Sequence, residues 1–176
     1  MQRDAHGVWS AFFPEAMYCD RLRHGSLYKL HVHGDNGWKD RIPAYATRVV
    51  QDEATKNYTA QFWAPEPFDW RGDAFDASKN GSLLIYEAHV GMAQEKEGVG
   101  TYREFTEKIL PIIKKDGYNA VQLMAIAEHP YYGSFGYHVS SFFAPASRCG
   151  TPEELKELVR RAHEPVSYTH LTLPTT

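Results

Sequence analysis

Two short apolar segments, each followed by a helix start signal, constrain the fold of this chain more than any other feature. The first, 83–90, lies between Gly81 and Gly91, and the second is 119–124. Apolar runs of this length are typical of parallel strands that helices cover, and the first predicts a strand buried on both faces. The order strand, helix, strand, loop, helix predicts the start of an α/β unit.

The first helix is predicted to begin after Thr101 and to end at Gly117. Thr101 and Glu104 have the spacing of a capping box. Pro111 should bend the helix, because proline lacks a backbone N–H. The apolar face is predicted to consist of Tyr102, Phe105, Ile109 and Ile112.

The second helix is predicted to begin after the N-cap Thr151, with Pro152 at its first position and Glu154 at its third. Its apolar stripe comprises Leu155, Leu158, Val159 and Ala162. We expect the repeat to stop before a third strand. Two strands cannot close a barrel, so this half of the chain should be poorly stable alone and prone to aggregate.

Residues 1–80 predict short strands. Side chains alternate along 27–32 with the period of a half-buried strand, and 58–63 is a second candidate. The segment 33–37 is a turn cluster, and 68–80 is a polar linker without periodicity. This region resembles a small β-sandwich that has lost its first strands.

The composition argues against several classes of partner. A net charge of −3 gives no electrostatic basis for binding nucleic acid or an anionic membrane. No apolar run approaches the ~20 residues of a membrane span, and residues 1–8 lack the pattern of a secretion signal. Cys19 and Cys149 are far apart and in no metal-like spacing, which predicts a cytoplasmic protein with reduced thiols.

A loop, 128–138, follows the C-terminal end of the second predicted strand, where barrel enzymes build their active sites. It carries two glycines, two histidines, one carboxylate and the rings of Tyr131, Tyr132, Phe135 and Tyr137. Aromatic rings stack on sugar faces, while His and Glu bond hydroxyls, so the loop suits a polyhydroxylated substrate. Packing on the rim of a barrel explains the same residues equally well.

The C-terminal tail differs in character from the rest of the chain. The segment 166–176 reads as the translation of a transposon-end sequencing adapter. We therefore expect 165–176 to be non-native, with the last native residue near Glu164, and exclude the tail from fold prediction. In this interpretation the chain is a truncated piece of a longer protein.

Several motifs follow one another in order: Tyr-Glu-Ala-His-Val-Gly at 86–91, Gln-Leu-Met-Ala-Ile-Ala-Glu-His at 122–129, Ser-Phe-Gly-Tyr at 134–137 and Gly-Thr-Pro-Glu-Glu-Leu at 150–155. In order and spacing they resemble the 1,4-α-glucan (glycogen) branching enzymes of glycoside hydrolase family 13, in the eukaryotic-type subgroup.

The resemblance implies a fold of class α/β plus β in two parts. Residues 1–80 would be the C-terminal part of a family 48 carbohydrate-binding module, a partial β-sandwich, with its linker. Residues 81–164 would be the first βαβα part of a TIM (β/α)8 barrel.

The resemblance also implies α-1,4-glucan as the partner. Tyr137 matches the tyrosine that stacks beneath the sugar next to the cleaved bond. The rest of that subsite would be shaped by Glu128, His129, Tyr132 and Phe135.

Other matched positions have less definite implied roles. In the module, Trp9 and Lys29 are candidate outer glucan contacts, with a core position as the alternative for Trp9. Glu87 and His89 match the first-strand motif, where a structural role and substrate contact are both open. His138 stands where the family commonly has glutamine, so no specific hydrogen bond is assigned to it.

The implied reaction is that of a retaining enzyme without a cofactor or metal. A carboxylate nucleophile and a carboxylic acid/base, ~5 Å apart, cleave an α-1,4 bond, and the segment moves to a 6-hydroxyl of another chain as an α-1,6 branch. Both carboxylates belong to family motifs beyond Glu164. No catalytic residue is therefore expected in this chain, and we predict that it is inactive.

Three alternatives remain open. A non-catalytic glucan-binding protein explains 1–80, although a binding module has no use for a barrel opening. A metal hydrolase would use His89, His129, His138 and Glu128, although these residues have no compact ligand spacing. Another family 13 α-glucan enzyme, such as a debranching enzyme or a maltogenic amylase, differs in motifs that lie beyond the tail.

Overall fold

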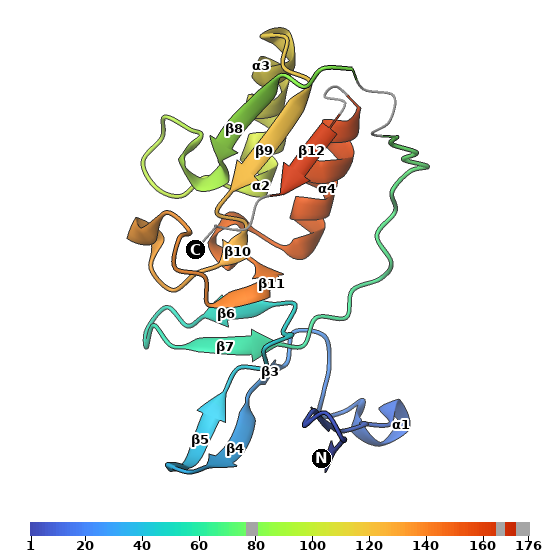
Figure 1. Ribbon diagram of the computed structural model, residues 1–176, viewed down its shortest axis with the longest axis vertical. Coiled ribbons are helices and arrows are strands. Elements are labelled where there is room, and N and C mark those ends of the chain that lie inside the picture. The colour runs from blue at the N-terminus through green and yellow to red at the C-terminus, as the bar shows by residue number, and fades with distance from the viewer. Residues whose placement is uncertain (77–80, 165–167, 172–176) are drawn as a thin grey trace.

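The computed structural model describes residues 1–76, 81–164 and 168–171. The N-terminal residues form small antiparallel sheets, and a parallel sheet with helices follows them (Figure 1). The end of the predicted linker, 77–80, and the tail segments 165–167 and 172–176 lie outside the described residues.

The N-terminal part contains short strands and one short helix. Its elements are β1 (Gln2–Arg3), β2 (Trp9–Ser10), α1 (Glu15–Tyr18), β3 (Leu27–Tyr28), β4 (Leu30–Gly34), β5 (Gly37–Arg41), β6 (Val49–Gln51) and β7 (Tyr58–Gln61). β1 pairs with β2 and β4 pairs with β5, while β3, β7 and β6 form a three-stranded antiparallel sheet.

The predicted strand 27–32 is divided in two at Lys29. β3 pairs with β7, whereas β4 pairs with β5, so the chain leaves one sheet and enters another. The turn predicted at 33–37 closes the β4–β5 hairpin, in which Gly34 lies opposite Gly37. Gly37 has a φ of 80°, which glycine adopts without steric cost.

The helices begin where the sequence predicts. The first consists of α2 (Tyr102–Glu104), the π-helix η3 (Phe105–Ile109) and α3 (Leu110–Lys115), and the second is α4 (Pro152–His163). The capping boxes of Thr101 with Glu104 and of Thr151 with Glu154 are both confirmed.

The apolar face of the first helix departs from the prediction by one residue. Leu110 and Ile113 are buried, whereas Ile112, predicted to lie on this face, is 53% exposed. The backbone N–H of Leu110 donates to the carbonyl of Phe105, five residues earlier. This wide turn adds a residue and shifts the face. Pro111 favours such a turn, because its ring crowds the preceding turn and it has no N–H to donate.

The second sheet contains three parallel strands in the order β12-β9-β8. They are β8 (Ile85–His89), β9 (Ala120–Met124) and β12 (Tyr168–Leu171). The prediction that the repeat stops before a third strand is wrong, because Tyr168 lies opposite Ala120 and starts a parallel ladder along β9. Unpaired N–H and C=O groups at a strand edge accept any extended backbone, whatever its sequence.

The first parallel strand is buried on one face only, contrary to the prediction. Ala88 is 6% exposed, whereas Ile85 is 52% exposed. Successive side chains of a strand point to opposite faces. The helices cover the face that Ala88 shares with Tyr86 (Figure 1).

The main core lies between the parallel sheet and the helices. Fully buried members come from β9 (Val121, Leu123), from the first helix (Phe105, Leu110) and from α4 (Leu158). Burying a large apolar side chain stabilises a fold by about 1.5–3 kcal/mol. This cluster therefore fixes the two helices against the strands.

A smaller cluster joins the two parts of the chain. After β9 the backbone forms β10 (Ala127–Glu128) and returns antiparallel to it as β11 (Ser141–Pro145). Ala144 of β11 packs in one core cluster with Ala46, Val49 and Ala60 of the N-terminal part. The segment after β9 is therefore packed against the sheet of β6 and β7.

Candidate functional site

The parallel strands bring their loops to one edge of the sheet. β8 ends at His89 and β9 at Met124, which are partners in the ladder. The segment 128–138 lies between β10 and β11 and contains the short helix η4 (Tyr132–Ser134). Figure 1 shows this segment in orange, at the end of the sheet nearest the N-terminal strands.

The carboxylate of Glu128 is fully buried and joins the start of the loop to the segment after β11. Its Oε2 accepts a hydrogen bond from the backbone N–H of Ser147 at 2.7 Å, and its Oε1 accepts one from the N–H of His129 at 3.2 Å. Arg148 Nη1 lies 3.9 Å from Oε1. Such partners replace the water that a buried charge loses. Glu128 therefore supports the loop from inside.

Arg148, which sequence reasoning missed, joins the loop to the N-terminal sheet. Its guanidinium donates to the carbonyls of His129 at 2.7 Å and Pro130 at 3.0 Å. It also donates to Gln51 Oε1 at 2.9 Å and to the Tyr58 hydroxyl at 2.6 Å. The sequence signal was slight, because one arginine beside a turn resembles many surface residues. The contacts fix the loop relative to β6 and β7.

Two histidines lie beneath the loop. His129 Nδ1 donates to the Ala127 carbonyl at 3.0 Å, and its Nε2 has no hydrogen-bond partner among the described residues. Both ring nitrogens of His89 also have none there. Burial lowers the pKa of His89, and the neighbouring His129 lowers it further. Buried nitrogens without a hydrogen-bond partner are costly, so the packing around the two histidines must compensate for them.

Glycines let the loop approach the strand ends closely. A Cβ on Gly91 would lie 2.8 Å from the Tyr132 hydroxyl oxygen. A Cβ on Gly136, which has a φ of 83°, would lie 2.6 Å from the backbone of Ala125. Phe135 itself has a φ of 51°. This backbone places the rings of Tyr132 and Phe135 edge-on to His89, with centroids about 6 Å apart.

The predicted loop residues divide into two groups. Tyr137 and Phe135 lie at the surface, 58% and 45% exposed, and Tyr132 is half-buried. Glu128 and His129 are 0% and 2% exposed. The side chains of Glu128 and His129 therefore lie beneath the loop, and the predicted glucan contacts of all these residues stay predictions.

The other predicted residues lie outside the loop or at its end. Trp9 is 60% exposed, so the alternative of a core position is wrong. Lys29 is exposed between β3 and β4. Glu87 accepts a hydrogen bond from Gln122 at 3.0 Å, and His138 is exposed at the end of the loop.

The metal-hydrolase alternative finds no support in the geometry. Within residues 1–76, 81–164 and 168–171, no group of three or more His, Cys, Asp or Glu side chains is arranged to hold a metal ion. In that same part of the chain, no helix has the length and apolar character needed to cross a membrane.

Two solved structures share the fold. The GBS pullulanase SAP in complex with maltotetraose superposes with a TM-score of 0.72 over 97% of this chain and 27% of its own, at 20% identity. A Salmonella typhimurium protein described as an alpha amylase gives 0.65 over 86% of this chain and 24% of its own, at 24% identity. The fold is therefore that of part of amylase-type chains.

Closer relatives are found by sequence, although no protein-family model matches the chain. A 1,4-alpha-glucan-branching enzyme of Yarrowia lipolytica is 48% identical over 169 residues, and one of Arabidopsis thaliana, 2-2, chloroplastic/amyloplastic, is 47% identical over 166. One of Solanum tuberosum is 45% identical over 168. Each match covers 93% of this chain and 24%, 21% and 19% of the relative, respectively. The predicted resemblance is confirmed: over most of its length the chain is homologous to 1,4-alpha-glucan-branching enzymes, and it spans about a fifth to a quarter of the length of these relatives.

Proposed function

We propose that the chain is part of a 1,4-α-glucan branching enzyme of glycogen biosynthesis. The whole enzyme would cleave an α-1,4-glucan and transfer the segment to a 6-hydroxyl of another chain. The single observation that carries this proposal is the identity of 44–48% to proteins of that name over 93% of the chain. Its proposed location is the cytoplasm, which two free cysteines support.

Within this proposal the chain has two native parts and a foreign tail. Residues 1–80 are the C-terminal part of a family 48 carbohydrate-binding module with its linker, and 81–164 open a TIM barrel. The change from antiparallel strands to a parallel sheet that begins with β8 supports this division.

The glucan would bind at the exposed rings of the loop. Tyr137 stacks on the sugar next to the cleaved bond, and Phe135 and Tyr132 border the same subsite. The exposure of Tyr137 and Phe135 supports direct contact. Glu128 and His129 act through the loop backbone. On the module, Trp9 and Lys29 make outer contacts with the glucan, which their exposure permits.

The proposed chemistry is a retaining double displacement. A carboxylate attacks the anomeric carbon while a second carboxylic acid protonates the leaving oxygen, and a 6-hydroxyl then displaces the enzyme from the covalent intermediate. The described residues contribute binding and orientation to these steps. A loop fixed by Arg148 and Glu128 orients the sugar without reorganising when the substrate arrives.

The test compares this chain with the product of the complete coding region. Amylose is incubated with each, and ¹H NMR measures the anomeric signal of α-1,6 linkages. We expect α-1,6 linkages from the complete protein and none from the chain alone. Shortened α-1,4 chains without new α-1,6 linkages from the complete protein would instead identify another α-glucan enzyme.

A further inference from the structure

The linker after β7 crosses the outer side of α4. It contacts the helix near the first and the last residue of α4. Trp63 Nε1 donates to the carboxylate of Glu153, at 3.0 and 3.2 Å to its two oxygens. At the far end His163 Nδ1 lies 2.6 Å from Asp73 Oδ2, and the rings of Phe75 and His163 stack with centroids 4.2 Å apart. These contacts hold the intervening linker beside the helix.

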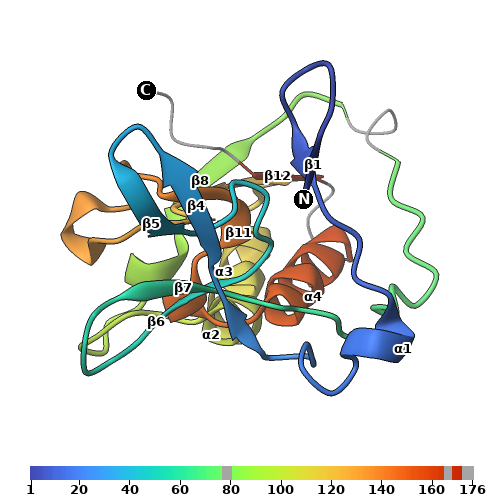
Figure 2. The ribbon, with the colours of Figure 1, turned by 90° about the horizontal axis from the view of Figure 1, so that it is seen from below.

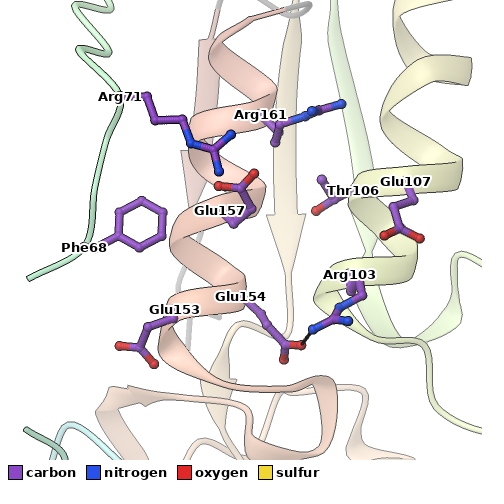
Figure 3. A pocket seen from close by; sticks show the side chains of 9 residues that line it. All are labelled: Phe68, Arg71, Arg103, Thr106, Glu107, Glu153, Glu154, Glu157 and Arg161. Atoms are coloured by element: carbon purple, nitrogen blue, oxygen red, sulfur yellow. Dashed lines mark hydrogen bonds and ion pairs between the residues drawn. The ribbon is translucent and has the colours of Figure 1, made fainter. Parts of the chain in front are cut away.

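A cavity of ≈ 520 Å³ lies between this linker, α4 and the first helix. Its volume is within the range of small-molecule sites, roughly 300–1,000 Å³. The linker contributes Phe68 and Arg71, the first helix contributes Arg103 and Glu107, and α4 contributes three glutamates and Arg161 (Figure 3). Figures 1 and 2 show the linker on one flank of the molecule and the orange loop on the other.

The charges around this cavity nearly balance. Four glutamates and three arginines line it, which leaves one net negative charge. Arg103 is paired with Glu154 at 3.0 Å. A phosphate or another anion would meet more carboxylates than guanidinium groups, so the wall favours an uncharged polar ligand.

Two planar groups at this cavity keep free hydrogen-bonding capacity, although the charge of Arg71 acts on the neighbouring Glu157 and helps to lower its pKa. The side chains of Arg71 and Glu107 have no hydrogen-bond or ion-pair partner in the part of the chain that the structure describes. A guanidinium donates two parallel hydrogen bonds and a carboxylate accepts two. Neighbouring hydroxyls of a pyranose ring match both geometries.

An aromatic wall completes the cavity. Phe68 packs edge-on against Trp70, with centroids 4.8 Å apart, and faces the cavity from the linker side (Figure 3). Sugar rings have an apolar face that packs on aromatic surface, so the wall and the planar polar groups match the two kinds of surface on a sugar.

We propose that this cavity binds a short α-glucan segment, roughly two or three pyranose rings, as a second site separate from the aromatic loop. The sugar class rests on the proposed function, whereas the position of the site rests on the cavity. A site here would hold one glucan strand on the outer side of α4 while another part of the glucan engages the loop.

Calorimetric titration of the 176-residue chain with maltopentaose tests the proposal. The double variant Arg71→Gly, Glu107→Gln removes both planar groups, and glycine suits the φ of 52° at position 71. Tyr137→Ala serves as the variant for the loop, and Glu97→Gln, at an exposed position away from the cavity, serves as the charge control. Circular dichroism melts establish that each variant folds like the parent chain.

We expect the chain with Tyr137→Ala to retain binding at the cavity, and the double variant to weaken that binding about a hundredfold, since two charged groups are lost and each lost charged hydrogen bond is worth about tenfold. Loss of all binding in Tyr137→Ala would overturn the proposal, as would unchanged affinity in the double variant or phosphate bound at the cavity with no glucan. The proposed function fails separately, by the absence of α-1,6 linkages from the complete protein.

Discussion

At the scale of single residues, the loop depends on backbone conformations that few residues adopt. Gly136 and Phe135 both have positive φ, next to Ala125 with a φ of 58°. Positive φ outside glycine costs of order 1–3 kcal/mol and persists where the surroundings compensate. Glu128 and Arg148 hydrogen-bond the backbone of His129, which lies between Ala125 and Phe135 in the chain.

Substitution of Gly136 tests this backbone. Gly136→Ala should lower the free energy of unfolding by about 2 kcal/mol or more, because the methyl group meets both the φ penalty and the backbone of Ala125. Gly98→Ala, at a φ of 109° with open space around it, isolates the φ penalty and should cost less. Urea denaturation measures the free energy of unfolding of both variants. Equal losses would show that the backbone of Ala125 does not exclude a methyl group at position 136.

The loop rings give a second residue-scale prediction. Tyr137→Ala should weaken maltopentaose binding at the loop about tenfold, because an exposed ring that stacks on a sugar contributes of order 1 kcal/mol or more. Tyr131→Ala is the matched control, since Tyr131 is 66% exposed in the same loop. If the control weakens binding as much as Tyr137→Ala, the assignment of Tyr137 is wrong.

The two thiols should differ in reactivity. Cys19 is exposed, whereas burial raises the pKa of Cys149 from 9.0 to about 12, with Glu128 adding to the rise. At pH 8 a disulfide reagent such as DTNB should modify Cys19 at once and Cys149 only after denaturation, because the thiolate reacts. The unfolded chain loses this proton near pH 9, so stability should fall as pH rises from 9 towards 12. Equally rapid reaction of both thiols in the native chain would contradict the burial.

At the scale of elements, Arg148 connects the loop to the N-terminal sheet. Arg148→Met should lower the free energy of unfolding by about 2–4 kcal/mol, because it leaves the buried Glu128 without its nearest cation and removes four hydrogen bonds. Arg23→Met removes an exposed ion pair with Asp20 and should change stability by about 0.5 kcal/mol or less. Chemical denaturation measures the free energy of unfolding of both variants. Equal losses would contradict the proposed role of Arg148 in connecting the loop to the sheet.

Local signals in the sequence predicted the helix starts, because a cap is a property of four consecutive residues. Thr101 and Thr151 were assigned correctly for this reason. The apolar face of the first helix was missed by one residue, since the wide turn before Pro111 changes the period itself. The burial of Glu128 and the contacts of Arg148 depend on segments up to 97 residues apart, which no local pattern contains.

At the scale of the whole molecule, the parallel sheet shows that the edge of a strand can pair with segments of different sequence. The segment Tyr168–Leu171 continues the ladder on β9, although the tail was expected to be foreign to the protein. A ladder of this kind is formed by backbone N–H and C=O groups. The position of the segment in the sheet therefore carries no information about its origin.

Resequencing the source DNA across codon 165 tests the central claim most directly. The account predicts that the reading frame continues past Glu164 into a third strand of the branching-enzyme type, and then into the motifs that carry the nucleophile Asp and the acid/base Glu. A frame that encodes 166–176 as printed and then stops would contradict it. In that case the chain would encode no branching enzyme, and glucan binding without catalysis would be the function to test.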